Sequence, residues 1–384
     1  MKVELISKLS DINKNDWNNL NTYNHPFTSY DFLNSLEVSK SVHSSKGWNP
    51  QHIIIKNTNQ EIIGVSPNYL KMHSYGEYIF DHSWANAFEN AGGQYYPKLI
   101  CAIPFTPATG PRIMINPENT DHKKIFDLII KTYELIVRNN KLSSAHINFT
   151  TDDFNKRLQN DNWIKRTGLQ FHWHNNNYET FDDFLNQLKS SKRKAIKNER
   201  KKIKNTNLVI DKLTGEQLNE EIWDSFYNFY LNTIDKKWGG AYLTKEFFYL
   251  LNETMKNHIL LIIAKQDKKV VAGALNFISK NTLYGRNWGS IVNIPFLHFE
   301  LCYYQAIEYA IEKNIKIVEA GAQGHHKIQR GYIAKPTYSN HFVLNDSFAK
   351  AIKNFTKLEE IEINKQIKFI NTENSPYSNI KLIP

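Results

Sequence analysis

An internal repeat constrains the fold of this chain more than any other feature of its sequence. The segments LISKLSDI at 5–12 and VIDKLTGE at 209–216 share a strand-like opening, a Lys-Leu pair and a Ser or Thr suited to starting a helix. Similar stretches follow in the same order in both halves. A repeat of this kind predicts two α/β domains of one topology, each built on a mixed sheet.

Each half has helices, then an antiparallel meander, then an amphipathic helix with a short strand. The expected early helices lie at 30–37, 221–233 and 245–255. The β-runs lie at 51–72, 77–84 and 258–289. The final helix and strand lie at 122–149 and 298–321.

A basic segment separates the two repeats. Residues 178–205 carry apolar side chains at helical spacing from Phe181 to Leu188 and then become basic, which predicts a connecting helix. We therefore expect a first domain over 1–177, this connecting helix over 178–205 and a second domain over 206–384. A chain of 384 residues is longer than one hydrophobic core usually organises, which agrees with two domains.

The N-terminal residues and the two cysteines indicate the expected location of the protein in the cell. The first residues, MKVELISKLSDINKNDW, lack the apolar core of a signal peptide, and no apolar run is long enough to cross a bilayer. A cytoplasmic location is therefore expected. Cys101 and Cys302 lie far apart in apolar surroundings, which favours buried free thiols over a disulfide or a metal pair.

The net charge of +10 is concentrated in one place. Residues 189–204 hold nine Lys and Arg against one Glu. This segment either contacts tRNA, phosphates or another anionic surface, or it is a solvated helix in a Lys-rich protein.

The start of the late helix in the second half is a candidate site. Trp288 ends a β-run, and His298 and Glu300 begin the helix that follows it. The N–H groups at a helix start suit a phosphate or a developing oxyanion. Alternatively, Glu300 merely compensates the helix dipole.

The stretch 319–342 is the strongest candidate from residue chemistry. Glu319 ends a strand expected to be buried, and the glycines after it allow a sharp turn. A glutamate beside His326 can take a proton from an amine, while Lys327 and Arg330 can hold an anion. The alternative is a buried polar network that fixes the loop.

In the first half, residues 80–112 contain Asp81 and Trp84 and end in a Pro-, Thr- and Gly-rich turn with Arg112. This turn is either a pocket wall where Arg112 binds an anion, or a rigid loop at a domain interface. The histidines at 172, 174, 325 and 326 lack the partners of a metal site, and no metal is expected. Phosphate-loop and GxSxG motifs are absent from the sequence, which argues against NTPases and hydrolases.

Four motifs together resemble a known family. They are YYPKL at 95–99, PFTPATGPR at 104–112, LHFELCYYQAIEYAI at 297–311 and GAQGHHKIQRGY at 321–332. In this order they resemble the bacterial predicted N-acyltransferase family, also called FemAB-like or peptidoglycan biosynthesis/recognition. The resemblance implies tandem acyl-CoA N-acyltransferase (GNAT-like) domains, related to the Fem enzymes that add amino acids from aminoacyl-tRNA to peptidoglycan precursors. Where the family usually has Gly-Glu-His-Lys, this chain has His325 in place of the glutamate.

The expected activity is N-acyl transfer from acyl-CoA, as co-substrate, to an amine acceptor, in a cleft of the second domain and the domain interface. The alternatives are a Fem-type transferase that uses aminoacyl-tRNA, with residues 189–204 contacting the tRNA, and a non-catalytic protein that binds a cell-wall precursor or nucleic acid. The expected catalytic residues are Glu300, Glu319 and His326. The expected substrate-binding residues are Asp81, Trp84, Phe105, Thr106, Gly110, Arg112, Arg286, Trp288, His298, Gln323, Lys327 and Arg330.

Overall fold

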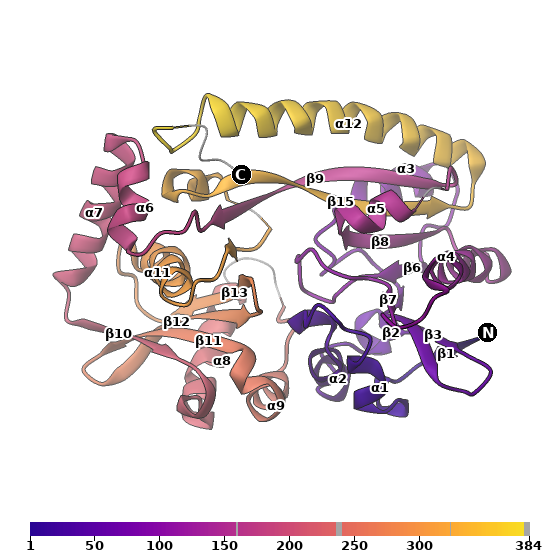
Figure 1. Ribbon diagram of the computed structural model, residues 1–384, viewed down its shortest axis with the longest axis horizontal. Helices are drawn as coiled ribbons and strands as arrows, with labels where there is room; N and C mark the ends of the chain where they lie inside the picture. Colours follow the sequence, from indigo (N-terminus) through magenta and orange to yellow (C-terminus); the bar gives the residue numbers. More distant parts are fainter. Residues whose placement is uncertain (159, 236–239, 323, 380–384) are drawn as a thin grey trace. The chain divides into compact units, whose positions relative to one another are not determined.

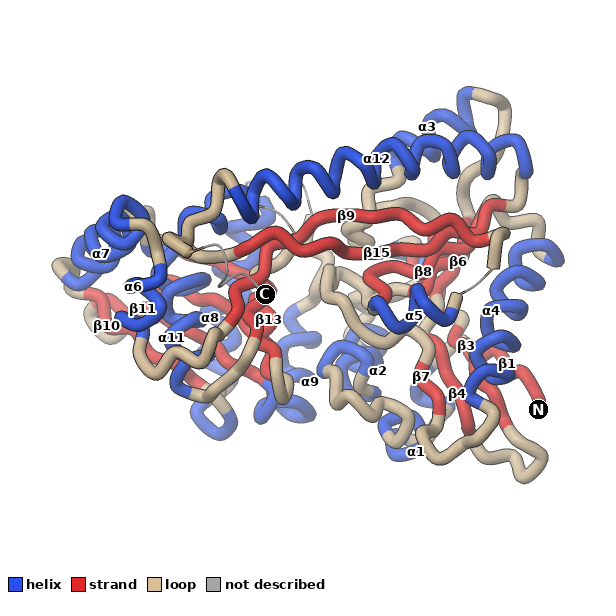
Figure 2. The backbone as a smooth tube through the Cα atoms, turned by 45° about the horizontal axis from the view of Figure 1, so that its top comes forward, coloured by secondary structure: helices blue, strands red, loops and turns tan. Residues whose placement is uncertain are grey.

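The computed structural model describes residues 1–158, 160–235, 240–322 and 324–379 (Figure 1). The chain folds into two compact units. Unit 1 comprises 1–168 and 336–364, and unit 2 comprises 169–335 and 365–384. Strands and helices occur in both units (Figure 2), so the expected α/β class is confirmed.

Unit 1 is built on two groups of strands. The first group, in the order β1-β3-β4-β7, is antiparallel and comprises β1 (Lys2–Ile6), β3 (His52–Lys56), β4 (Ile62–Ser66) and β7 (Met114–Ile115). The second group comprises β2 (Trp48–Pro50), β5 (Tyr69–Lys71), β6 (Lys98–Cys101) and β8 (Ser144–Thr150). Within it, β6 and β8 are parallel, because the long helix α4 (His122–Asn139) lies between them in the chain.

The other helices of unit 1 are α1 (Lys14–Asn18), α2 (Tyr30–Val38), α3 (His82–Asn90) and α5 (Asp152–Arg157). Ser29 begins α2 by accepting a hydrogen bond from the Phe32 N–H, as expected for a serine at a helix start. The buried face of α4 packs Ile125, Ile129 and Tyr133 into the core of unit 1.

Unit 2 repeats this plan with unbroken strands. The antiparallel meander comprises β10 (Leu208–Leu213), β11 (Ile259–Gln266), β12 (Lys269–Ile278) and β13 (Thr282–Ser290). Strand β14 (Ile317–Glu319) pairs parallel to β13 and antiparallel to β9 (Trp163–His174). The helices are α6 (Phe181–Gln187), α7 (Ser190–Lys204), α8 (Glu220–Asp235), α9 (Lys245–Met255), α10 (Leu297–Phe299), the π-helical turn η6 (Glu300–Tyr304), α11 (Gln305–Glu312) and the 3-10 helix η7 (His325–Arg330).

The two units share one topology. In each, an antiparallel meander precedes a helical segment, α4 or α10 to α11, and this segment leads to a strand parallel to the last strand of the meander. This is the strand order expected of tandem GNAT-like domains, and the predicted repeat is confirmed. The β-run expected at 77–84 is wrong: residues 77–79 form bends, α3 begins at His82, and β6 is the strand that pairs with β5. In unit 1 the strands corresponding to β11 and β12 are interrupted, at Gln51 between β2 and β3 and at 67–68 between β4 and β5.

The boundaries of the units differ from those expected. Residues 336–364, expected in the second domain, lie in unit 1 because β15 (Ile333–Val343) pairs with β8 and because Ile352 of α12 (Asp346–Thr372) packs near Trp84. The expected connecting helix is broken into α6 and α7, since Leu188 forms a β-bridge with Tyr377. Helix α7 belongs to unit 2, where Ile196 and Ile203 enter the core.

Both cysteines are free thiols; Cys101 is buried and Cys302 is partly buried. Across the described residues, no helix has both the length and the apolar character that a bilayer span needs.

Candidate functional site

In unit 2, the pairing between β13 and β14 ends partway along β13. Their parallel pairing runs from Thr282 and Ile317 to Tyr284 and Glu319, where β14 ends, while β13 continues along β12 to Ser290. The next residue of β13, Gly285, lies beside the end of β14, since a Cβ atom there would be 3.4 Å from the Glu319 carbonyl oxygen. The chain leaves β14 through Gly321, which has a φ of 76°. Backbone N–H groups at such a divergence suit an oxyanion.

Lys327 lies at this end of β14. It is 1% exposed, and its Nζ donates a hydrogen bond to the Gly321 carbonyl oxygen at 3.0 Å. Burial lowers the pKa of Lys327 to about 7. A lysine with this pKa is partly neutral at neutral pH and can therefore accept or donate a proton.

His326, the neighbour of Lys327 in η7, belongs to an aromatic cluster. Its Nε2 lies 2.8 Å from the Tyr303 hydroxyl oxygen, and its ring centroid lies 6.1 Å from that of His298. The His298 ring in turn meets Trp288 at 5.3 Å. The structure therefore brings together three predicted residues, Trp288, His298 and His326, and adds Tyr303, which the sequence did not single out.

Arg330 is held by three groups. Its guanidinium stacks on Phe299, 3.4 Å from the ring centroid, and donates to Glu199 at 2.9 and 3.0 Å. It also donates to the His326 carbonyl oxygen at 2.8 Å. Since Glu199 already balances its charge, this geometry favours a role in positioning η7. Glu199 is the one acid of the basic segment, and Tyr304 also donates to it.

Glu300 lies in a buried ion pair. Arg200 of α7 donates to both carboxylate oxygens at 3.0 to 3.3 Å, and Gln305 donates at 2.8 Å. Arg200 also donates hydrogen bonds to the Glu308 carboxylate. These contacts favour a structural role for Glu300, and its role as a base stays a prediction.

We expect Glu300→Gln to lower the free energy of unfolding by about 1–3 kcal/mol, because it removes the buried charge that faces the partly buried Arg200 guanidinium. Urea unfolding at neutral pH measures this. Glu308→Gln, at the more exposed partner of Arg200, serves as the control and should cost less than about 1 kcal/mol. Loss of turnover in Glu300→Gln with unchanged stability would instead identify a base.

Glu319, the other predicted base, is buried at the end of β14. Its Oε1 lies 3.9 Å from His172 Nε2, and burial lowers the pKa of His172 to about 3, so this histidine is neutral. Arg286 is partly buried on β13, one residue past Gly285. The predicted residue Gln323 lies outside the described residues.

In unit 1, Asp81 belongs to a buried charge cluster. Lys98 Nζ lies 2.5 Å from Asp81 and 2.9 Å from Glu77, and it donates to Ser74 at 2.8 Å. The Tyr95 hydroxyl donates to Asp81 at 2.7 Å. Burial raises the pKa of Glu77 to about 7. Burial alone would lower the pKa of Lys98, but the two carboxylates outweigh it and raise that pKa. The sequence did not single out Lys98, although it lies inside the YYPKL motif.

Trp84 is a core residue beside this cluster. Its ring meets that of His341 at 4.9 Å, and the Arg166 guanidinium lies 4.8 Å from its ring centroid.

The other predicted residues of unit 1 form a rigid loop. Phe105 has a φ of 57° and packs against Trp48, and Thr106 donates to the Pro104 carbonyl oxygen. A Cβ atom on Gly110 would lie 2.5 Å from His25. The buried Arg112 donates to the carbonyl oxygens of residues 148, 111 and 108, at 2.8, 3.2 and 2.6 Å. These bonds favour a structural role for Arg112 over the expected anion contact.

Among the residues that the structure describes, no three His, Cys, Asp or Glu side chains are grouped to hold a metal ion.

The comparisons with known proteins agree with this architecture. The family model FemAB-like, described as peptidoglycan biosynthesis/recognition, matches residues 8–379. The crystal structure of FemX aligns with a TM-score of 0.53 and 11% identity, over 92% of this chain and 100% of that one. A conserved protein of unknown function from Bacteroides thetaiotaomicron gives 0.54 and 12%, over 89% and 100%. L-PGS from Bacillus licheniformis gives 0.52 and 7%, over 92% and 98%. At these identities the structures share the fold, and a search of curated proteins found no match.

Proposed function

Because this chain belongs to the FemAB-like family of peptidoglycan biosynthesis/recognition, we propose that it is a transferase that moves an aminoacyl group onto an amine of a peptidoglycan precursor. The observation that carries this proposal is the site in unit 2, where β13 and β14 diverge beside the buried Lys327. The resemblance to Fem enzymes favours aminoacyl-tRNA as the donor, and an acyl-CoA donor is the alternative.

The proposed reaction is one acyl transfer. The acceptor amine attacks the donor carbonyl carbon, a C–N bond forms, and the C–O bond to the tRNA ribose, or the C–S bond to CoA, breaks. Backbone N–H groups of β13 beyond Tyr284 stabilise the oxyanion. Neutral Lys327, or His326 through its contact with Tyr303, takes the amine proton and returns it to the leaving oxygen or sulfur.

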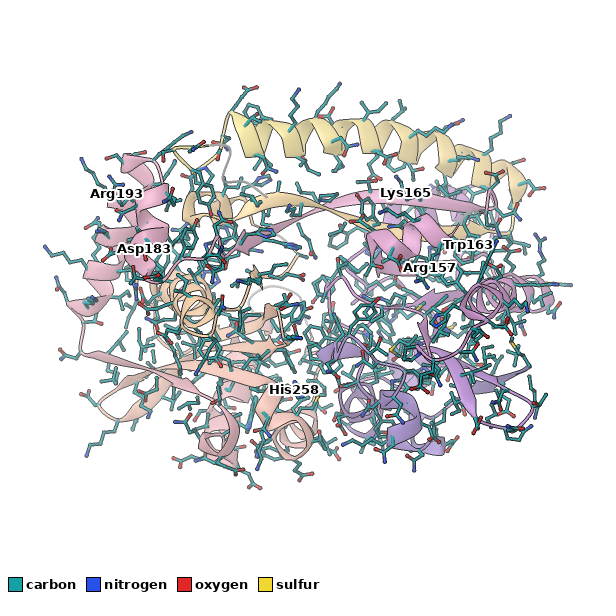
Figure 3. All side chains as sticks on the ribbon, in the orientation of Figure 1. Arg157, Trp163, Lys165, Asp183, Arg193 and His258 are labelled. Carbon is teal, nitrogen blue, oxygen red and sulfur yellow. The ribbon has the colours of Figure 1, made fainter. Side chains whose placement is uncertain are left out.

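The outer face of α7 suits an RNA donor. One face of this helix, an arc of about 100° at 100° per residue, carries Arg193, Lys194, Lys197, Lys201 and Lys204. Arg193 is labelled on α7 in Figure 3. Glu199 and Arg200 instead face the unit 2 contacts described above. One side of α7 therefore packs against the rest of unit 2, and another side presents cations. Such a cationic face favours the binding of a polyanion such as RNA.

Charge reversal on this face tests the donor. In a transfer assay with aminoacyl-tRNA and a peptidoglycan-precursor amine, Lys194→Glu/Lys197→Glu/Lys201→Glu should lower kcat/KM for the tRNA by about tenfold or more and flatten its salt dependence. The matched control is Lys123→Glu/Lys124→Glu/Lys131→Glu on α4. It should change neither kcat/KM for the tRNA nor the salt dependence.

Acetyl-CoA in the same assay separates the alternatives. Release of free CoA with acylation of the amine, and no product from aminoacyl-tRNA, would favour the CoA-dependent reaction. Binding of the precursor without product from either donor would refute the transferase and favour a recognition protein.

A further inference from the structure

Glu199 is the one acid of the basic segment 189–204, and it lies on the packed side of α7. Ile196 comes three residues before it and Ile203 four residues after it, and both enter the core of unit 2. Residues three and four apart share a face of a helix, so Glu199 lies on this buried side. It is therefore directed away from the cationic face that the proposed RNA donor would contact.

The Glu199 carboxylate joins the ends of two short helical turns of unit 2. It accepts a hydrogen bond from the hydroxyl of Tyr304, the last residue of η6. Both of its oxygens accept from Nη2 of Arg330, the last residue of η7, at 2.9 and 3.0 Å. Burial raises the pKa of Tyr304, so this hydroxyl stays protonated and donates. One carboxylate of α7 therefore holds both η6 and η7.

The same two turns carry the groups that would move the proton in the proposed reaction. Tyr303 belongs to η6, and His326 and Lys327 belong to η7. The Tyr303 hydroxyl oxygen lies 2.8 Å from His326 Nε2, so this contact depends on how the two turns are placed. Arg330 Nη1 donates to the His326 carbonyl oxygen at 2.8 Å. The Arg330 guanidinium therefore links Glu199 directly to the residue that carries the imidazole.

We propose that Glu199 is a positioning residue for the transfer reaction. Its carboxylate fixes η7 against η6 and so keeps His326 and Lys327 in place for proton transfer. Hydrogen bonds between charged groups are strong and directional enough for this task. Displacement of a reacting group by about 1 Å can cost about 10²-fold in rate. This inference rests on the proposed function, because the groups that Glu199 positions are those of the proposed reaction.

Hydrogen exchange of the full chain tests the anchoring without any substrate. The N–H groups of Lys327, Gly331 and Tyr332 are hydrogen-bonded within 324–332, so their exchange reports whether this turn is held. Glu199→Gln removes the charge that faces Arg330 and should speed their exchange by about tenfold or more, since local opening then costs less. Exchange in β11, in the middle of the meander, should stay unchanged.

The transfer assay tests the consequence for the reaction. Glu199→Gln should lower kcat by about 10- to 100-fold and leave KM for donor and acceptor within about twofold, because the carboxylate contacts neither substrate in this scheme. Tyr304→Phe is a milder second variant, since it removes the bond from η6 and keeps the ion pair. It should lower kcat by about threefold or more.

Glu359→Gln in unit 1 is the matched control. Glu359 accepts from Arg166 at 2.7 and 2.8 Å, and this guanidinium also lies over the Trp84 ring and donates to a backbone carbonyl oxygen at 3.0 Å. The acidic side chains of the two pairs are 15% and 23% exposed, and the arginines 7% and 14%. A contribution to stability alone should therefore lower the melting temperature similarly in both variants. Only Glu199→Gln should change kcat and the exchange of 324–332.

Two results would overturn the inference. One is unchanged exchange of 324–332 in both Glu199→Gln and Tyr304→Phe. The other is a kcat that Glu199→Gln leaves unchanged or that Glu359→Gln lowers equally. Both can occur in an active transferase, so they leave the proposed function standing. A lack of transfer by the unaltered protein with either donor would instead refute the proposed function, and with it the catalytic consequence of this anchor.

Discussion

Lys98→Met is expected to lower the free energy of unfolding by about 3–5 kcal/mol, because it leaves two buried carboxylates without their cation. Lys98 is fully buried and lies within 2.9 Å of both Asp81 and Glu77. Urea unfolding at about pH 8 measures the effect, because Glu77, with a pKa of about 7, is then mostly ionised.

Removing the carboxylates as well should reverse the loss. Lys98→Met/Glu77→Gln/Asp81→Asn should recover most of the lost stability, because no unpaired charge stays buried. Lys124→Met is the matched control, since its ion pair with Asp121 is exposed, and it should change stability by less than about 0.5 kcal/mol. A cost below about 1 kcal/mol for Lys98→Met would show that water reaches this cluster.

Lys327→Met is expected to lower the rate of transfer by about 10²- to 10⁴-fold, the range in which a positioned acid or base contributes. The measurement is kcat with saturating donor and acceptor. Lys313→Met, at an exposed lysine after α11, is the control and should keep full activity. Full activity in Lys327→Met would refute its role in proton transfer.

The same variant should be more stable than the unaltered protein at low pH. Burial lowers the pKa of Lys327 from 10.5 to about 7, so between these values the unfolded chain binds more protons than the folded chain. The stability of the unaltered protein therefore rises with pH across this window. Lys327→Met removes that dependence, and we expect it to be about 1–3 kcal/mol more stable near pH 6, with the difference shrinking toward pH 10. Urea unfolding over this pH range, with Lys313→Met beside it, tests the sign.

Local pattern was sufficient for several helices, but not for the β-run expected at 77–84, where bends and the start of α3 are observed. The helices expected at 30–37, 221–233 and 245–255 are observed at Tyr30–Val38, Glu220–Asp235 and Lys245–Met255. These segments carry their own start residues and apolar periodicity, which depend only on neighbours in the chain. The repeated order of such elements was therefore readable as two domains of one topology.

Pairing between distant segments was not readable in this way. Residues 336–364 have no local property that assigns them to unit 1; the hydrogen bonds of β15 to β8 and the packing of α12 do so. The basic segment looked uniform in sequence, yet Glu199 and Arg200 face buried partners while Lys194, Lys197 and Lys201 stay exposed.

The candidate site was likewise predictable from the sequence only in part. The sequence by itself determined the repeat, the two-domain α/β fold and the polar stretch after β14 that contains His326, Lys327 and Arg330. Only the tertiary structure decided that Lys327 is buried against Gly321, that Glu300 is occupied by Arg200, and that Lys98 joins Asp81 and Glu77. The physical reason is that helix and strand preferences act between near neighbours, whereas burial and charge pairing depend on contacts between residues far apart in the chain.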